Sequence, residues 1–298
     1  MQEYLARPRP HTGGTVYRHS MSELTEPITG TPLQVVLPDE SAQMSPRTLV
    51  ELGVRAEELG VDAVWLPDHL LPPAPYGRTF GGVYEPLVAL AHLAALTRRI
   101  RLGTSVLVAP MRDPFVLAKQ VATLDALSEG RFVLGVGTGW SREEFEAVGS
   151  DFATRGARTD ETLRLLRHLF EGEGPFEGRF HSYERGVFAP RPARRVPVMV
   201  GGTSDRALRR AAEWADVWQG VGLDTAGFVE ARNRLRELTP RPVRAGMRIA
   251  WSGGEEEFER AVGLFRELTA AGADAVAVWF GDAEGFGERM ERFAAALR

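Results

Sequence analysis

The feature that most constrains the fold is an eightfold alternation of short apolar segments with amphipathic segments, which runs from residue 33 to the end of the chain. The apolar segments have the length and composition of strands, and the amphipathic ones have helical periodicity. The predicted strands are 33–37, 62–66, 100–108, 131–137, 197–201, 215–220, 243–251 and 274–280. The predicted helices are 46–60, 85–98, 114–128, 158–171, 204–214, 224–238, 255–271 and 284–297.

Strands that are apolar along almost their whole length indicate a parallel sheet covered by helices, because both faces are buried. Eight such units close naturally into a (β/α)8 TIM barrel of the α/β class, which typically has about 250 residues. An open doubly wound sheet is the alternative, and the regularity of the units disfavours it. Two insertions are predicted: one follows strand four, and the other, at 172–196, precedes strand five. In the second, FEGRFHSYERGVF predicts a hairpin.

Residues 1–30 carry Gly, Pro, Thr and Arg with little apolar periodicity. We expect a disordered N-terminal extension there, with Met21 as an alternative start of the chain. The folded barrel domain is then expected to span residues 31–298.

The composition excludes several classes of function. The 298-residue chain has no cysteine, which excludes disulfides, thiolate nucleophiles, iron–sulfur clusters and zinc bound by cysteine. A cysteine-free chain without an apolar signal segment near its start is expected in the cytoplasm. No apolar stretch approaches the roughly 18 residues of a membrane helix, and the net charge of −4 is spread over interspersed acids and bases. We therefore expect a small-molecule substrate as partner, and neither a membrane nor a nucleic acid.

In a TIM barrel the active site lies at the carboxyl ends of the strands, so the residues there limit the chemistry. Schiff-base chemistry is excluded because Lys119, the one lysine of the chain, falls inside the third predicted helix. Only His69 among the histidines lies at a strand end, so no metal site is expected. Glu143 and Glu144 come only in the loop beyond strand four, so the facing carboxylates of a glycosidase are missing. The remaining residues at the strand ends are mainly apolar, and at such a site a bound cofactor would supply the reactive groups.

Two glycine-rich loops leave adjacent strands. GVGTG (135–139) is not the dinucleotide fingerprint, because Trp140 stands where that motif needs its last glycine. VGGTSDRAL (200–208) opens a helix whose free N–H groups face an anion. Either loop alone is also consistent with an ordinary strand-to-helix turn, whereas the two together favour phosphate binding.

The pair Asp68–His69 follows strand two and has two interpretations. Either Asp68 caps a loop and His69 packs against its neighbours, or both residues belong to the active site. Trp65, earlier on the same strand, is predicted to pack inside the barrel rather than to bind a ligand.

Three blocks of sequence resemble the luciferase-like monooxygenase family, and together with the excursion after strand four they extend the likeness over essentially all of residues 33–298. The longest is RLGTSVLVAPMRDPFVLAKQVATLDALSEGRFVLGVGTGW (101–140). VWLPDHL (64–70) and PVMVGGTSDRALRRAAEWADVWQ (197–219) match in order and spacing. The resemblance implies a TIM barrel with a flavin or deazaflavin across its mouth, and a homodimer formed through outer helices.

The resemblance also implies the roles of individual residues. A cis peptide bond at Ser105–Val106 is expected to support the ring of the cofactor. Asp68 and His69 are the expected catalytic residues, with His69 as proton donor or substrate-orienting group. The expected cofactor-binding residues are Asp68, Thr104, Ser105, Val106, Gly137, Thr138, Gly139, Gly201, Gly202, Thr203 and Ser204. The expected substrate pocket consists of Trp140, Leu37 and Trp218.

The choice of cofactor rests on the motif Pro-Asp-His (67–69), which is similar to the branch of the family that uses the deazaflavin coenzyme F420. FMN is the alternative. Trp140 is a departure, because F420-dependent sugar-phosphate dehydrogenases place a glutamate there, and this puts a sugar-phosphate substrate in doubt. Four hypotheses stay open: F420-dependent hydride transfer to or from a small organic substrate, a monooxygenase using reduced FMN and oxygen, a non-catalytic cofactor-binding barrel, and a purely structural barrel that binds no cofactor.

Overall fold

The computed structural model describes residues 32–38, 44–72 and 84–298. The extension predicted at 1–30, with Met21, lies outside the described residues. Within them, eight parallel strands form a barrel. In chain order they are β1 (Leu33–Val36), β2 (Ala63–Leu66), β3 (Arg101–Thr104), β5 (Phe132–Gly137), β8 (Val198–Gly201), β9 (Val217–Val221), β10 (Arg244–Ala250) and β11 (Ala275–Trp279).

The ends of this sheet meet. The strand β1 pairs with both β2 and β11, and β3 pairs with β5, so the hydrogen-bonded ladder runs all the way round. A two-residue strand, β4 (Leu107–Val108), continues the third strand and also pairs with β5. The predicted (β/α)8 barrel is confirmed, and the open doubly wound sheet is excluded.

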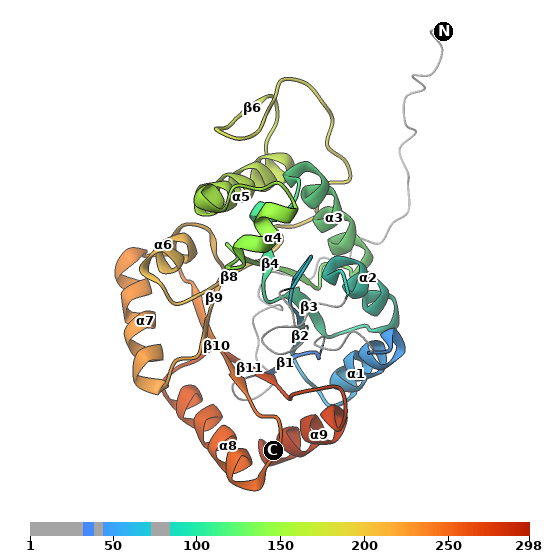
Figure 1. Ribbon diagram of the computed structural model, residues 1–298, viewed down its shortest axis with the longest axis vertical. Coiled ribbons are helices and arrows are strands. Elements are labelled where there is room, and N and C mark those ends of the chain that lie inside the picture. The colour runs from blue at the N-terminus through green and yellow to red at the C-terminus, as the bar shows by residue number, and fades with distance from the viewer. Residues whose placement is uncertain (1–31, 39–43, 73–83) are drawn as a thin grey trace. The chain divides into compact units, whose positions relative to one another are not determined.

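Helices surround the barrel as an outer ring (Figure 1). They are α1 (Pro46–Glu58), α2 (Pro86–Leu96), α3 (Pro114–Leu127), α5 (Arg155–Glu171), α6 (Asp205–Trp214), α7 (Thr225–Leu238), α8 (Glu255–Ala270) and α9 (Phe286–Ala296). Several begin where local chemistry requires it. Ser45 caps α1 and Asp113 caps α3, each followed by a proline, whose missing N–H costs nothing at the first helical position. The predicted bounds are confirmed to within a few residues.

Both predicted insertions are present. After β5, a short helix α4 (Arg142–Ala147) and the 3-10 turn η2 (Phe152–Thr154) lead into α5. Before β8, the strands β6 (Phe176–Glu177) and β7 (Ser182–Tyr183) pair antiparallel, which confirms the predicted hairpin. In Figure 1 this segment projects beyond α5. A further 3-10 turn, η1 (Ala109–Met111), follows β4.

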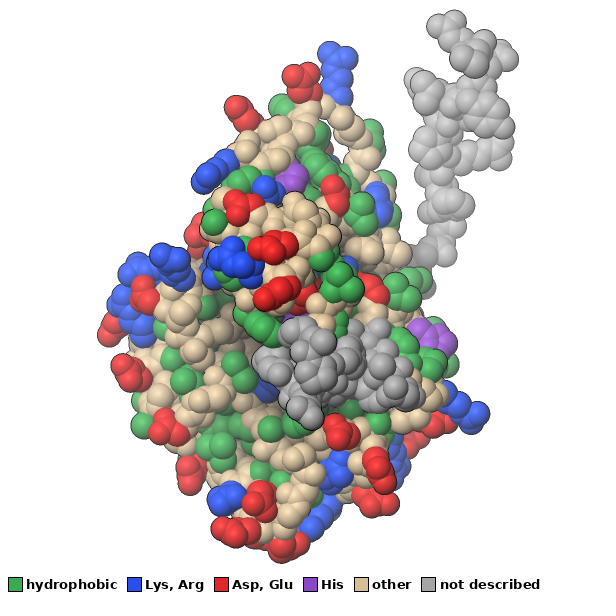
Figure 2. Space-filling view, viewed as in Figure 1, with side chains coloured by type: hydrophobic (Ala, Val, Ile, Leu, Met, Phe, Trp, Pro, Cys, Tyr) green, Lys and Arg blue, Asp and Glu red, His purple; other side chains and the backbone are tan. Residues whose placement is uncertain are grey.

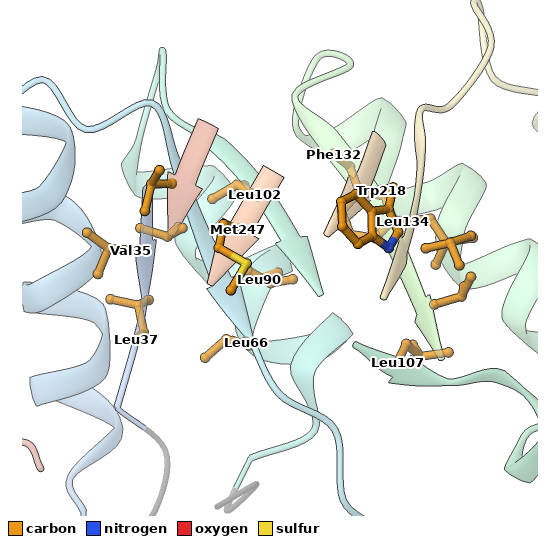
Figure 3. Packing of buried hydrophobic residues seen from close by; sticks show 14 of the residues in the cluster. Val35, Leu37, Leu66, Leu90, Leu102, Leu107, Phe132, Leu134, Trp218 and Met247 are labelled. Atoms are coloured by element: carbon orange, nitrogen blue, oxygen red, sulfur yellow. The ribbon is translucent and has the colours of Figure 1, made fainter. Parts of the chain in front are cut away.

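The barrel strands contribute to two buried clusters, because successive residues of a strand face opposite sides of the barrel wall. The larger cluster packs strands against helices (Figure 3). A smaller cluster, which includes Val36, Trp65 and Met199, fills the barrel interior. Trp65 donates its indole N–H to Gln34 Oε1 at 2.9 Å, so the prediction that it packs inside the barrel is confirmed.

Leu37 and Trp218 correct the predicted substrate pocket. Both side chains are fully buried in the layer between strands and helices (Figure 3). Leu37 follows Val36, which faces the interior, so the alternation turns Leu37 outward. Trp218 stacks on Phe228 of α7 with 6.0 Å between the ring centroids. The prediction that these two residues line a pocket is therefore wrong.

The surface carries mixed charge. Figure 2 shows acidic and basic side chains interspersed over the face drawn there. Among the helices that the structure describes, none combines the length and the apolar character needed to cross a bilayer.

Candidate functional site

A cavity of about 720 Å³ opens at the carboxyl ends of the barrel strands, where the active site of such a barrel is expected. This volume is typical of sites that hold cofactors and small substrates. Its lining consists of Pro67, Asp68, His69, Ser105, Val106, Val108, Gly137, Thr138, Gly139, Trp140, Gly201, Gly202, Gln219, Val221, Gly222, Leu223, Arg248, Ile249, Ala250, Leu264 and Trp279. A smaller cavity of about 260 Å³, between α5 and α6, shares none of these residues.

The third barrel strand is interrupted at this cavity, between β3 and β4. The peptide bond between Ser105 and Val106 is cis, as the family resemblance implied. The Ser105 hydroxyl donates to Gln219 Oε1 at 2.7 Å, and Arg248 Nη1 donates to the Ser105 carbonyl oxygen at 3.4 Å. Polar groups from β9 and β10 therefore hold the interrupted segment from across the barrel.

The Val106 side chain occupies the space beside two neighbouring strand ends. A Cβ atom on Gly137 would lie 2.4 Å from Val106 Cγ2, and one on Gly201 would lie 2.7 Å from Val106 Cγ1. Real carbon–carbon contacts need about 3.5–4.0 Å, so no other residue fits at either position while Val106 stays in place. The result is a stretch of cavity wall built from backbone and one small side chain.

Asp68 is anchored by donors from the segment that follows β4. Its buried carboxylate accepts hydrogen bonds from the Val108 N–H at 2.8 Å and from Arg112 Nη2 at 2.6 Å. Arg112 also pairs with Glu85 at 2.7 Å. Burial lowers the pKa of Arg112, but the carboxylates of Asp68 and Glu85 outweigh it and raise that pKa above its ordinary value. The geometry thus favours the capping interpretation of Asp68: it positions the loop that carries His69.

The His69 side chain lines the cavity, and one of its ring nitrogens is hydrogen-bonded to a carboxylate on α4. Its Nδ1 is 2.8 Å from Glu144 Oε2 on α4, and Glu144 Oε1 accepts the N–H groups of Leu70 and Leu71, each at 2.9 Å. The His69 side chain is 7% exposed and that of Glu144 is 2% exposed. The Trp140 ring stands edge-on to the imidazole, with 5.8 Å between centroids. An imidazole held in this way can exchange a proton with a molecule in the cavity.

The loop after β8 combines a left-handed glycine with a capped helix. Gly202 has φ +116°, which favours glycine, and its carbonyl oxygen accepts the Trp218 indole N–H at 2.8 Å. Ser204 caps α6 by accepting the Ala207 N–H at 3.2 Å. Gly202 lines the cavity, whereas Thr203 and Ser204 are exposed outside its lining.

The model of the luciferase-like monooxygenases matches residues 29–252, about three quarters of the chain. The chain belongs to this family.

Relatives of this luciferase-like protein include an F420-dependent glucose-6-phosphate dehydrogenase of Kineococcus radiotolerans, which is 36% identical over 203 residues. The match covers 65% of this chain and 59% of the relative, so the chain spans about three fifths of the length of that protein.

Two solved structures have the same luciferase-like barrel. An F420-dependent secondary alcohol dehydrogenase in complex with an F420–acetone adduct has a TM-score of 0.74 at 18% identity, covering 90% of this chain and 99% of the other. A type II Baeyer–Villiger monooxygenase of Pseudomonas putida in complex with FMN has a TM-score of 0.67 at 14% identity, with coverages of 89% and 95%. At this identity the likeness concerns the fold.

Most of the predicted site residues of the luciferase-like barrel meet in the 720 Å³ cavity. They are Asp68, His69, Ser105, Val106, Gly137, Thr138, Gly139, Trp140, Gly201 and Gly202. Thr104 is a correction like Leu37 and Trp218, because it is fully buried and its hydroxyl donates to the Gly135 carbonyl oxygen at 2.7 Å. It joins β3 to β5 and does not face the cavity.

Sequence reasoning missed several polar residues of the site, among them Glu144, Gln219 and Arg248. Gln219 is the polar residue of β9, and Arg248 lies between apolar residues within β10, whose other arginine, Arg244, stands at the start of the strand. A polar residue among apolar strand neighbours is the signal that points to an inward, functional position. Glu144 carried no such signal, because it lies on a short helix beyond the strand tip.

Proposed function

We propose that this protein is an oxidoreductase that uses coenzyme F420 to transfer a hydride to or from a small, uncharged organic substrate. The observation that carries the proposal is His69, the one imidazole among the described residues lining the 720 Å³ cavity. The names of similar proteins support it, since a relative is called an F420-dependent dehydrogenase and a structure of the same fold an F420-dependent alcohol dehydrogenase.

The cavity residues fit a flat ring system. Val106, together with the backbone of Gly137 and Gly201, makes a wall without long side chains, against which a ring would lie. Gln219 and Arg248 supply polar groups on the opposite strands. Ser105, Thr138, Gly139 and Gly202 complete the set of residues that would hold the coenzyme. Arg248 is the one charged residue of this set, as expected where the cofactor supplies the reactivity.

A deazaflavin, when bound, accepts or donates a hydride at a ring carbon. His69 would hold the proton that leaves or reaches the substrate oxygen, because an imidazole exchanges protons readily near neutral pH. Asp68 and Arg112 would keep the loop that carries His69 in place through their buried ion pair. The apolar walls would exclude water from the reacting atoms.

The remainder of the lining favours an uncharged substrate. Trp140 and Val221 line the cavity and are 48% and 54% exposed, which leaves apolar surface for a substrate to cover. Arg248 is the one lysine or arginine among the described lining residues, and Lys119 contacts the Phe188 ring on the outside of the barrel. Because a phosphate dianion is usually held by several charge-assisted hydrogen bonds, we infer a neutral alcohol or carbonyl compound rather than a sugar phosphate.

Binding and turnover measured on the purified protein test the proposal. We expect F420 to bind and its absorbance to change with secondary alcohols or ketones. We expect His69→Ala to lower turnover about 10²–10⁴-fold while the dissociation constant for F420 changes only a few-fold. His92→Ala, at an exposed histidine on α2, is the control. Tight FMN binding without F420 binding would instead support an FMN-dependent monooxygenase. F420 binding without turnover across a substrate panel would support a non-catalytic barrel.

A further inference from the structure

We infer that Glu144 is a positioning residue that sets the tautomer of His69 and thereby makes the cavity-facing edge of the imidazole a proton acceptor. The consequence for catalysis rests on the proposed function. The tautomer itself is a property of the protein alone, so it can be tested separately.

The hydrogen bonds around Glu144 determine which ring nitrogen carries the proton. An ionised carboxylate only accepts hydrogen bonds, so the nitrogen that faces it must be protonated. Glu144 Oε1 is occupied by the N–H groups of Leu70 and Leu71, each at 2.9 Å, and Oε2 is 2.8 Å from His69 Nδ1. Nδ1 therefore donates, and in the neutral imidazole the lone pair lies on Nε2.

This tautomer is suited to the removal of a proton from an alcohol. As the substrate O–H bond breaks, its proton would bind His69 Nε2. The carbonyl product would form because a bound oxidised deazaflavin would accept the hydride of the adjacent carbon. The imidazolium so formed keeps its hydrogen bond to the Glu144 carboxylate, and the opposite charge stabilises it. Reduction of a carbonyl compound follows the same path in reverse.

Three other charged groups among the described residues line the cavity or neighbour Glu144, and each has a partner of its own. The Asp68 carboxylate is paired with Arg112 at 2.6 Å, so its charge is largely compensated. Arg248 reaches the cavity from β10, where it donates to the Ser105 carbonyl oxygen. On α4 itself, Glu143 precedes Glu144 but is exposed, with its carboxylate 3.4 Å from the Ser141 hydroxyl. Glu143 is thus a matched control, because it has the same charge and sits one position away on the same helix.

The first experiment measures ¹⁵N shifts of the imidazole in histidine-labelled protein without coenzyme. We expect the wild type to show the Nδ1–H tautomer. In Glu144→Gln the amide oxygen can still accept from Leu70 and Leu71, while the amide NH₂ donates to His69 Nδ1, so the Nε2–H tautomer should replace it. Glu143→Gln should leave the tautomer unchanged.

The second experiment measures alcohol oxidation with F420. We expect Glu144→Gln to lower kcat about 10–100-fold, the usual range for a lost partner of a functional histidine, with KM and the dissociation constant for F420 within a few-fold of wild type. Glu143→Gln should match the wild type in all of these quantities.

Three results decide the matter. A wild-type protein with the Nε2–H tautomer overturns the inference, whether or not Glu144→Gln folds. A Glu144→Gln protein with the wild-type tautomer and the kcat of Glu143→Gln also overturns it, and reduces Glu144 to a cap on the Leu70–Leu71 backbone. If the tautomer changes as expected while the wild type turns over no substrate with F420, the positioning role stands and the proposed function fails.

Discussion

At the scale of single residues, the cavity depends on two positions where a side chain is excluded. The family resemblance implies that Gly137 and Gly201 contact a cofactor, and glycine lets a ligand approach the backbone. The structure supplies a second reason, since both glycines make room for Val106. Packing around Val106 and access to a ligand therefore impose the same residue type, and sequence alone cannot separate the two demands.

We predict that Gly201→Ala lowers the free energy of unfolding by about 1–3 kcal/mol, the usual cost of overpacking, because its Cβ would meet Val106 Cγ1 at 2.7 Å. Chemical denaturation checks this. Gly263→Ala is the control, because a Cβ on that residue of α8 meets nothing within 4 Å. The control should be neutral or stabilising by up to about 1 kcal/mol.

The cause can be isolated by combining Gly201→Ala with Val106→Ala. If the clash with Val106 is the reason, the double variant should lose less stability than the sum of the single variants, since the new methyl group enters the space vacated by valine. Strict additivity would show that Gly201 is needed for some other reason.

At the scale of elements, the insertion before β8 is tied to the barrel by one buried carboxylate. Glu161 on α5 accepts the N–H groups of Phe180 at 2.9 Å and His181 at 2.8 Å, and its Oε1 lies 3.2 Å from His181 Nδ1. Burial raises the pKa of Glu161, but the backbone N–H groups of Phe180, Arg179 and His181 outweigh it, so the pKa lies below its ordinary value of 4.5. The turn between β6 and β7 is thus held by a charge.

A lowered pKa in the folded state gives stability that is present at neutral pH and is lost as the pH falls. Below about 4.5, the ordinary pKa of glutamic acid, the unfolded chain binds a proton that folded Glu161 still resists. We predict that Glu161→Gln lowers the free energy of unfolding at pH 7 by about 1–3 kcal/mol, because one acceptor is replaced by a donor. Its decline in acid should also be shallower than that of the wild type.

Urea unfolding between pH 3 and pH 7 checks this prediction. Glu171→Gln, at an exposed glutamate near the end of α5, is the matched control and should follow the wild type. Parallel curves for Glu161→Gln and wild type would show that the Glu161 charge does not hold the turn.

At the scale of the whole molecule, two adjacent outer helices carry an apolar surface. The helix α2 has no charged residue between Pro86 and Leu96, and on its outside Val88 is 66% exposed and Leu96 is 50% exposed. On the neighbouring α3, Val116 and Leu127 are 56% and 59% exposed. Because a helix that is apolar all round is normally buried, we propose that a second copy of this chain covers this surface across a two-fold axis.

We predict that the protein is a dimer in solution and that the double variant Val88→Glu/Leu96→Glu is monomeric, because the interface would bury uncompensated charges. Size-exclusion chromatography with light scattering measures the mass. Val187→Glu, at a residue that is 96% exposed in the insertion, should remain dimeric. A monomeric wild type would refute the proposal.

The architecture was predictable because its signals are local. Apolar strands, helical periodicity, and the caps Ser45 and Asp113 each act within a few residues, so the barrel, its eight units and both insertions follow from reading along the chain. The candidate site was predictable wherever it lies at a strand tip, as at His69, since parallel strands place their carboxyl ends together. The cis bond at Ser105–Val106 followed from family resemblance.

What only the tertiary structure decided is how residues far apart in sequence meet and which way a borderline side chain faces. His69 and Glu144 are separated by 75 positions, and nothing local indicates that one holds the other. Thr104, Leu37 and Trp218 were misplaced because burial depends on which face of a closed wall a side chain occupies. A one-residue change in register reverses that face, and the register is set by pairing with neighbouring strands rather than by the strand itself.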